Sequence, residues 1–250
     1  TVRRLRARTA LALGMLAAPI AAGSSHAAIL VTNTSDSGAG SLRAAIQQAN
    51  AQAGLDTIEM SVPGTIALAS PLPTLTDPLT IVGLGASQSV LDAQHLGRIV
   101  VVGSFGGGDT FRIEGFTFTG ALEDGDGGAL YLSGGNSLEL VGCSFAGNEA
   151  TGNGGALRSN GSLTVEDGIF DANQCGNIGG AIYASDGDLT IRSTVFSDNH
   201  NPNRGGAVIA SVPTQISDAT FTGNQSIEGG ALYFSGANLT LARSHFDDNQ

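Results

Sequence analysis

GGAIYASDGDLTIRSTVFSDN, residues 179–199, decides the fold, because close copies of this stretch precede and follow it along the chain. Each copy opens with Gly-Gly-Ala and closes with Phe-x-x-Asn, and the copies recur every 24 to 27 residues. The repeated residues are Gly127, Gly128, Phe145, Asn148, Gly154, Gly155, Phe170, Asn173, Gly179, Gly180, Phe196, Asn199, Gly205, Gly206, Phe221, Asn224, Gly229, Gly230, Phe246 and Asn249. A fixed period of this length indicates stacked units, none of which can bury its apolar residues alone.

Apolar residues within each copy follow the period of two that is typical of β-strands. Leu189 and Ile191 share one face of such a strand, and Ile182 comes directly after Gly-Gly-Ala. The position of Ile182 is aliphatic in every copy whereas that of Tyr183 varies, so we expect the first to face inward and the second outward. Two short strands per copy, separated by Gly, Asn, Asp and Ser clusters, can pair only with neighbouring copies. The sequence therefore predicts an all-β solenoid, a right-handed parallel β-helix that rises roughly 4.8 Å per coil.

The corners of the coil carry two further regularities. The repeated Asn lies where the chain leaves the Phe strand, so we expect it to adopt the left-handed conformation and to form an amide ladder along the solenoid axis. The residue two before each Phe is small from Cys143 onward, which predicts a tight interior corner. Phe116 and Ala121 replace the small residue and the Asn in the first coil, so we expect an irregular start of the array.

The alternation of Gly-Gly-Ala plus an aliphatic residue with Phe-x-x-Asn resembles the repeats of chlamydial polymorphic outer membrane proteins. The resemblance covers Gly127 to Asn249, about half of the chain. It implies a pectin lyase-like β-helix in a cell-surface or secreted, adhesin-like passenger protein. It implies no catalytic residues.

The first 27 residues have the pattern of a signal peptide. Arg3, Arg4, Arg6 and Arg8 form a basic start, an apolar stretch runs from Ala10 to Ala22, and Ser25-His26-Ala27 is a small-x-small end. The apolar run is too short to span a membrane comfortably, which favours a cleaved signal over a membrane anchor. We expect cleavage before Ala28 and export to the cell surface, to the outer membrane or to the medium.

Residues 28–102 are predicted to cap and begin the solenoid, and residues 103–250 to form its repeats. Strand-like runs extend over Ile29 to Thr32, Thr57 to Met60, Thr65 to Ala69, Leu79 to Val82 and Ile99 to Val102. One helix is expected among them, with Ser41 as N-cap, an apolar face of Leu42, Ile46 and Ala49, and a stop at Gly54. Laid across the first coil, this α-helix would close the N-terminal end of the core.

The segment from Asp36 to Ile58 also resembles the N-terminal segment of bacterial CSLREA-type β-helix proteins. Gly40 stands where that name has Cys, and Ala44 where it has Glu. The resemblance implies the same architecture and no ligand.

Composition restricts the partners. The chain has 22 acidic and 11 basic residues and no Lys, and residues 28–250 keep only seven of the basic ones, a formal charge of −15. An acidic surface disfavours nucleic acid and anionic lipid. Cys143 and Cys175 are out of register by seven residues, so we interpret them as a corner and a turn residue rather than a disulfide. Because Gln250 follows a repeat corner directly, we expect the array to continue into further coils and a C-terminal anchor.

Two groups of residues are candidates for a site. Tyr131, Arg158, Tyr183, Ile209 and Tyr233 occupy the variable outward position, where aromatic rings beside an Arg suit a glycan or a partner protein, although a plain ladder of strand-forming residues explains them as well. Asp124 and Asp126 precede the first Gly-Gly, and Asp186 and Asp188 form a similar turn. These carboxylates could bind Ca²⁺, but Asp-Gly turn chemistry also accounts for them, and their spacing fits neither an EF-hand nor an RTX repeat.

The sequence as a whole favours a monomeric surface or secreted protein that binds a glycan or protein along its side, without catalysis and without a cofactor other than possible Ca²⁺. The first alternative is a polysaccharide lyase or hydrolase of the same fold, which would place carboxylates and an Arg together in one groove. The second is a structural spacer, which would have a featureless surface.

Overall fold

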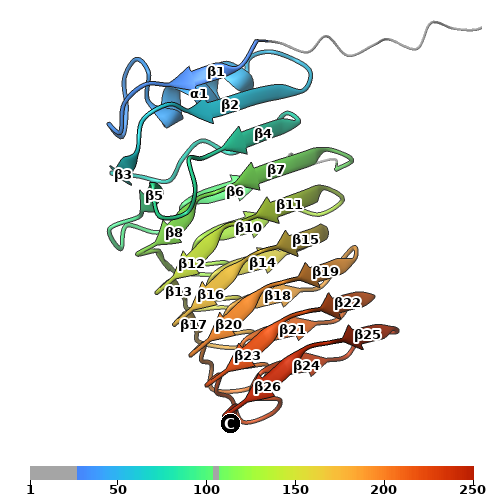
Figure 1. Cartoon of the computed structure of the whole chain (residues 1–250). Coiled ribbons are helices and arrows are strands. Elements are labelled where there is room, and N and C mark those ends of the chain that lie inside the picture. The colour runs from blue at the N-terminus through green and yellow to red at the C-terminus, as the bar shows by residue number, and fades with distance from the viewer. Residues whose placement is uncertain (1–26, 104–106) are drawn as a thin grey trace, which may run out of the picture.

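The chain winds into a stack of coils, with β1 and α1 at one end and β25 and β26 at the other (Figure 1). The computed structural model describes residues 27–103 and 107–250, so the predicted signal peptide lies outside the described residues except for Ala27. Each strand that pairs does so in parallel with its counterpart in a neighbouring coil. The predicted parallel β-helix is therefore confirmed.

Three sheets run along the solenoid, and a fourth is short. The nine-stranded sheet contains β1 (Ile29–Val31), β2 (Asp56–Met60), β4 (Leu79–Val82), β7 (Thr110–Glu114), β11 (Ser137–Val141), β15 (Ser162–Glu166), β19 (Leu189–Arg192), β22 (Thr214–Ser217) and β25 (Leu239–Ala242). The eight-stranded sheet contains β3 (Gly64–Ala67), β5 (Ser89–Asp92), β8 (Thr117–Thr119), β12 (Ser144–Ala146), β16 (Ile169–Asp171), β20 (Val195–Ser197), β23 (Thr220–Thr222) and β26 (His245–Asp247). The six-stranded sheet contains β6 (Val100–Val102), β10 (Leu130–Leu132), β14 (Leu157–Ser159), β18 (Ile182–Ala184), β21 (Val208–Ala210) and β24 (Leu232–Phe234). The fourth sheet contains β9 (Leu122–Glu123), β13 (Glu149–Ala150) and β17 (Gln174–Cys175).

Each repeat has three strands, and some have a fourth, where we expected two. The repeated Phe belongs to its own strand: Phe145 lies in β12, which Gly142 and Cys143 separate from β11. Gly142 has a φ of 56°, so the chain turns at this point instead of continuing as one strand. Cys143 is a buried interior corner as predicted, whereas Cys175 is a buried residue of β17 and not a turn residue. Both thiols are free.

The core is a column of side chains from successive coils. Rings of the repeated Phe residues stack along the axis from Phe118 to Phe246, with centroids 4.6 to 5.0 Å apart. This spacing matches the separation of paired strands, because each ring lies above its counterpart in the next coil. Thr214 breaks the aliphatic column beside the stack, and its buried hydroxyl donates to the Val212 carbonyl at 2.8 Å.

The predicted asparagine ladder is present, with one correction to its backbone. The Nδ2 amide of Asn148 donates to Oδ1 of Asn173 at 3.0 Å, and the same bond repeats from Asn173 onward to Asn199, Asn224 and Asn249. The left-handed conformation belongs to the residue before each Asn, such as Gly147 with a φ of 60°, and not to the Asn itself. The preceding residue makes the turn, which leaves the buried Asn side chain pointing along the axis to both neighbouring coils.

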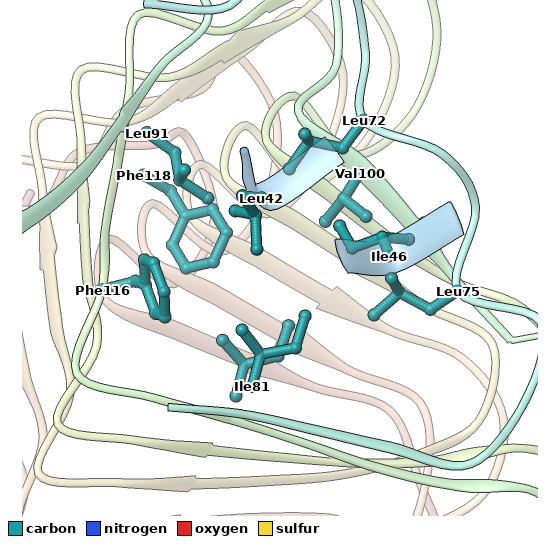
Figure 2. A pocket seen from close by; sticks show the side chains of 10 residues that line it. Leu42, Ile46, Leu72, Leu75, Ile81, Leu91, Val100, Phe116 and Phe118 are labelled. Carbon is teal, nitrogen blue, oxygen red and sulfur yellow. The ribbon is translucent and has the colours of Figure 1, made fainter. Parts of the chain in front are cut away.

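The expected cap helix is α1 (Leu42–Ala49), and the side chain of Ser41 caps it by accepting from the Ala44 amide. Its buried face includes Leu42 and Ile46, which pack over Phe116, Phe118 and other side chains of the first coils (Figure 2). Only about 10 Å³ of space remains between them. The helix thus closes the N-terminal end of the core, although it ends at Ala49 and not at Gly54.

Candidate functional site

The outward positions of the six-stranded sheet form one continuous row. Strand register places Val101, Tyr131, Arg158, Tyr183, Ile209 and Tyr233 side by side in successive coils. The structure therefore brings all the predicted ligand-binding residues together on one face. We refer to these six residues as the outer row.

Arginines stack on the tyrosines of the outer row at every second coil. The guanidinium carbon of Arg98 lies 5.3 Å from the ring centroid of Tyr131, that of Arg158 lies 3.9 Å from Tyr183, and that of Arg204 lies 5.1 Å from Tyr233. Such cation–π contacts fix both partners on the sheet surface.

The middle of the outer row is tightly packed. Arg158 is 12% exposed, stacks on Tyr183, and places its Nε 3.5 Å from Oδ2 of Asp126. Ile209 is buried although it points outward. One face of the Tyr183 ring is thus covered by Arg158, so the centre of the row offers little open aromatic surface to a ligand.

The row opens into a cleft of about 1190 Å³ at its N-terminal end. Val101 forms the floor of this cleft, because its side chain is short where the next coil has the much larger Tyr131 in register. The cleft spans three consecutive coils, which corresponds to about 10 Å along the axis at the usual strand spacing. Its lining consists of Thr74, Thr76, Arg98, Val101, Gly103, Gly125, Asp126, Tyr131, Ser133 and Gly134. We call this space the Tyr131 cleft.

Asn50, which caps the C-terminus of α1, holds one wall of the Tyr131 cleft in place. Its Nδ2 amide donates to the Thr74 carbonyl at 2.6 Å, and its Oδ1 accepts from the Thr76 amide at 3.0 Å. The backbone of this wall is therefore satisfied by the cap. Thr74 and Thr76 both line the cleft at this wall.

The opposite wall presents two more hydroxyls. Ser133 Oγ lies 2.9 Å from the Val102 carbonyl and 2.7 Å from the Gly103 carbonyl, to which it donates. The Tyr131 hydroxyl accepts from Nδ2 of Asn160 at 2.5 Å. The Tyr131 phenol is thus held in position while its hydroxyl proton remains available for a further bond.

Every charged group that lines the Tyr131 cleft has a partner of opposite charge. Arg98 Nη2 donates to Oε1 of Glu123 at 2.9 Å, and Arg98 Nε donates to the Gly127 carbonyl at 2.8 Å. Asp126 Oδ1 accepts from the backbone and the side-chain amide of Asn153 at 2.8 and 2.7 Å, while its Oδ2 faces Arg158. The lining of the cleft is mainly apolar, and its charges are balanced.

The predicted Ca²⁺ residues lie at separate places. Asp124 and Asp126 precede β10, whereas Asp186 and Asp188 follow β18, so the two pairs lie two coils apart and beyond opposite ends of their strands. Asp124 accepts from the Thr151 hydroxyl at 3.0 Å, and Asp186 accepts from the Gly187 amide at 2.8 Å. Within residues 27–103 and 107–250, no three His, Cys, Asp or Glu side chains gather into a metal-binding group. Calcium binding stays a prediction.

A shallower hollow of about 320 Å³ lies near the C-terminal end of the outer row. Asn177, Asn203, Arg204, Ile227 and Glu228 are among its lining residues. Arg204 and Glu228 form an exposed ion pair with a 2.7 Å contact. Surface pairs of this kind contribute little to stability, and this hollow is much smaller than the Tyr131 cleft.

Sequence reasoning missed Arg98, Thr74, Thr76 and Ser133. Three of them lie in front coils that have no Gly-Gly-Ala repeat, so no periodic pattern marked them. One signal for Arg98 follows from the strand register. Val100 pairs with Leu130, so Arg98 occupies the position that Gly128 has in the next coil. A charged side chain where later coils have glycine indicates a local departure from the repeat.

Comparison with known proteins places the chain in a family. The sequence model of the right-handed β-helix region matches residues 104–250, and the chain belongs to this family. The predicted right-handedness is thereby confirmed. The structure is also similar to a solved chain titled Geobacillus virus E2 ORF18, with a TM-score of 0.36 and 11% identity, over 88% of this chain and 61% of that one. This chain therefore corresponds to less than two thirds of that protein's length. A search of curated proteins finds no match.

The described residues contain no helix with the length and hydrophobicity needed to cross a membrane.

Proposed function

We propose that the protein binds a glycan segment in the Tyr131 cleft and does not alter it chemically. The observation that carries this proposal is the cleft itself, whose described lining combines the aromatic side chain of Tyr131 with several hydroxyls and balanced charges. Binding sites generally join an apolar surface to a few placed polar groups. A sugar offers the complementary surface, with C–H groups for the ring and hydroxyls for the threonines and Ser133.

The dimensions of the cleft agree with this proposal. Three coils correspond to about 10 Å along the axis, which is enough for a short run of sugar rings and too short for a folded protein interface. The formal charge of −15 over residues 28–250 disfavours nucleic acid as an alternative occupant.

A carbohydrate-active enzyme is the second candidate, and one observation favours it. Asp126, Glu123, Arg98 and Arg158 lie together beside the cleft, as a lyase or hydrolase would require. General acid–base catalysis on a glycosidic bond needs two carboxyl groups that are free to exchange protons across the bond. Both carboxylates here are engaged with an arginine, which favours binding over cleavage.

Export and surface location are part of the same proposal. They are supported by the signal-peptide pattern of residues 1–27 and by the resemblance of the repeats to those of polymorphic outer membrane proteins. An adhesin-like passenger of this kind would present the side of the solenoid, and with it the Tyr131 cleft, to glycans outside the cell.

A glycan array followed by calorimetry on the purified protein tests the proposal. We expect binding of at least one oligosaccharide, and Tyr131→Ala should weaken it by about tenfold or more, since an aromatic contact contributes on the order of 1.5 kcal/mol. Tyr233→Ala, which removes the same side chain four coils away, is the matched control and should bind normally.

Product analysis on the same mixtures separates the two candidates. Unchanged oligosaccharides after prolonged incubation, with and without Ca²⁺, are expected for a binding protein. New reducing or unsaturated ends that disappear in Asp126→Asn would establish the enzyme instead. If Tyr131→Ala and Tyr233→Ala bind alike, the cleft is not the site.

A further inference from the structure

Arg98 is the only basic side chain among the described residues that line the Tyr131 cleft, and its Nε and Nη2 donors are already committed to the protein. Its Nη2 contacts Glu123 and also the Asp126 carbonyl at 2.5 Å, while Nε donates to the Gly127 carbonyl. These acceptors belong to the loop that enters β10. The guanidinium is thus turned toward the protein and away from bidentate contact with a ligand.

Glu123 holds Arg98 at two points. Its Oε1 accepts from Nη2 and its Oε2 accepts from the Arg98 backbone amide, each at 2.9 Å. The two side chains are 18% and 22% exposed, so the pair is partly shielded from water. Separating two such charges costs more than separating a surface pair, because the remaining charge is left with little solvent.

Asp126 adds a carboxylate to the lining of the cleft. Its partner Arg158 is 12% exposed and stacked on Tyr183, so that positive charge is not accessible to a ligand. A carboxylate or sulfate in the cleft would therefore meet the charge of Asp126, while the charge of the lining residue Arg98 is already balanced by Glu123. The net charge of −15 for residues 28–250 adds to this repulsion.

We infer that the glycan in the Tyr131 cleft is uncharged, and that the Arg98–Glu123 pair makes the cleft select against uronic-acid and sulfated sugars. This inference rests on the proposed function and specifies its ligand class. Hydroxyl groups of a neutral sugar can exchange hydrogen bonds with Thr74, Thr76 and Ser133 without breaking either ion pair. An acidic sugar must displace Glu123 from Arg98 or share with Glu123 a positive charge that is already balanced.

The test compares neutral oligosaccharides with their carboxylated or sulfated counterparts on one array, for instance methyl-esterified and free hexagalacturonate. Wild-type protein should prefer the neutral member of each bound pair by about tenfold or more, because an unpaired like charge at an interface costs several kcal/mol. Glu123→Gln releases Arg98 and should reduce this preference at least about fivefold, mainly through tighter binding of the acidic member.

Glu139→Gln is the matched control. Glu139 pairs with Arg112 on the nine-stranded sheet, so its replacement removes the same charge and an arginine partner at a site outside the cleft. The preference for neutral sugars should not change in this variant. Wild-type binding should also be insensitive to added salt, a measurement that remains decisive if Glu123→Gln does not fold.

Three outcomes would count against these ideas in different ways. Tighter wild-type binding of the acidic members overturns the inference and leaves glycan binding in place. An unchanged preference in folded Glu123→Gln shows that the ion pair does not set selectivity, which also overturns it. Absence of binding to every neutral and acidic sugar refutes the proposed function itself.

Discussion

Removing one amide from the middle of the asparagine ladder is the most direct test of what holds the coils in register. The side chain of Asn173 makes four hydrogen bonds: Oδ1 accepts from the Asn148 backbone amide and side chain, and Nδ2 donates to Phe145 O and to Oδ1 of Asn199. Asn173 is fully buried, so water cannot replace these partners.

The expected cost of Asn173→Ala follows from the groups that lose a partner. The Asn148 backbone amide and the Phe145 carbonyl each lose a bond in the interior, and an unsatisfied buried group costs about 1–3 kcal/mol. We therefore expect the free energy of unfolding to fall by about 2–6 kcal/mol. Asn203→Ala is the matched control, because this amide is exposed and should cost under about 0.5 kcal/mol.

Urea unfolding followed by far-ultraviolet circular dichroism measures both variants, since the chain has no Trp to serve as a fluorescent probe. A loss below about 1 kcal/mol for Asn173→Ala, or one equal to that of Asn203→Ala, would refute the claim that the ladder stabilises the stack. Asn173→Asp tests the direction in which the stability of the fold changes with pH. Its second oxygen would face two acceptors, so it should fold better at acidic pH, where the carboxyl can keep a proton and donate.

Gly180→Ala should abolish folding or cost about 3 kcal/mol or more, because the added Cβ would overlap the Gly206 carbonyl oxygen of the next coil. Gly147→Ala should cost only about 1 kcal/mol for its left-handed backbone, because its Cβ would meet open space. Thermal unfolding compares the stabilities of the two variants. Burial raises the pKa of the Cys143 and Cys175 thiols to about 11, so native protein at pH 8 should not react with a disulfide reagent until denaturant is added. The folded state keeps these protons above the ordinary thiol pKa of 9.0, at which unfolded thiols lose theirs, so stability should fall as the pH rises from 9 toward 11. A constant urea midpoint over that range would contradict this expectation.

The architecture could be predicted from the sequence because each repeat coil packs against coils with a similar sequence. A residue such as Phe170 packs on its own copies one period before and after it, so its contacts can be inferred from the repeat alone. The same reasoning predicted the asparagine ladder, the interior corner at Cys143 and the outward position of Tyr183. Local capping chemistry at Ser41 predicted the start of α1, for a different and equally short-range reason.

The parts that could not be predicted depend on where the repeat changes. The third strand was missed although the alternation changes phase at the turn at Gly142, since Leu140 and Phe145 both face inward but are an odd number of residues apart. The Tyr131 cleft lies where Val101 replaces a large outward side chain, and Arg98, in the place of a glycine, lines it. Its ion pair joins residues 25 positions apart, Arg98 and Glu123, and no motif marks such a pair. The cleft is thus a departure from the pattern that predicted the fold.

Asn50 gives the cap helix a second effect beyond closing the core. The backbone amide of Asn50 ends α1 by donating to carbonyls of the last turn, and its side chain fixes the backbone of Thr74 and Thr76, so helix and cleft wall order or loosen together. By thermodynamic linkage, a ligand that binds the ordered wall also protects the helix from fraying. A mutation that frays the helix correspondingly lowers the affinity of the cleft for its ligand. Amide exchange in α1 therefore reports on occupancy of a site that the helix does not touch.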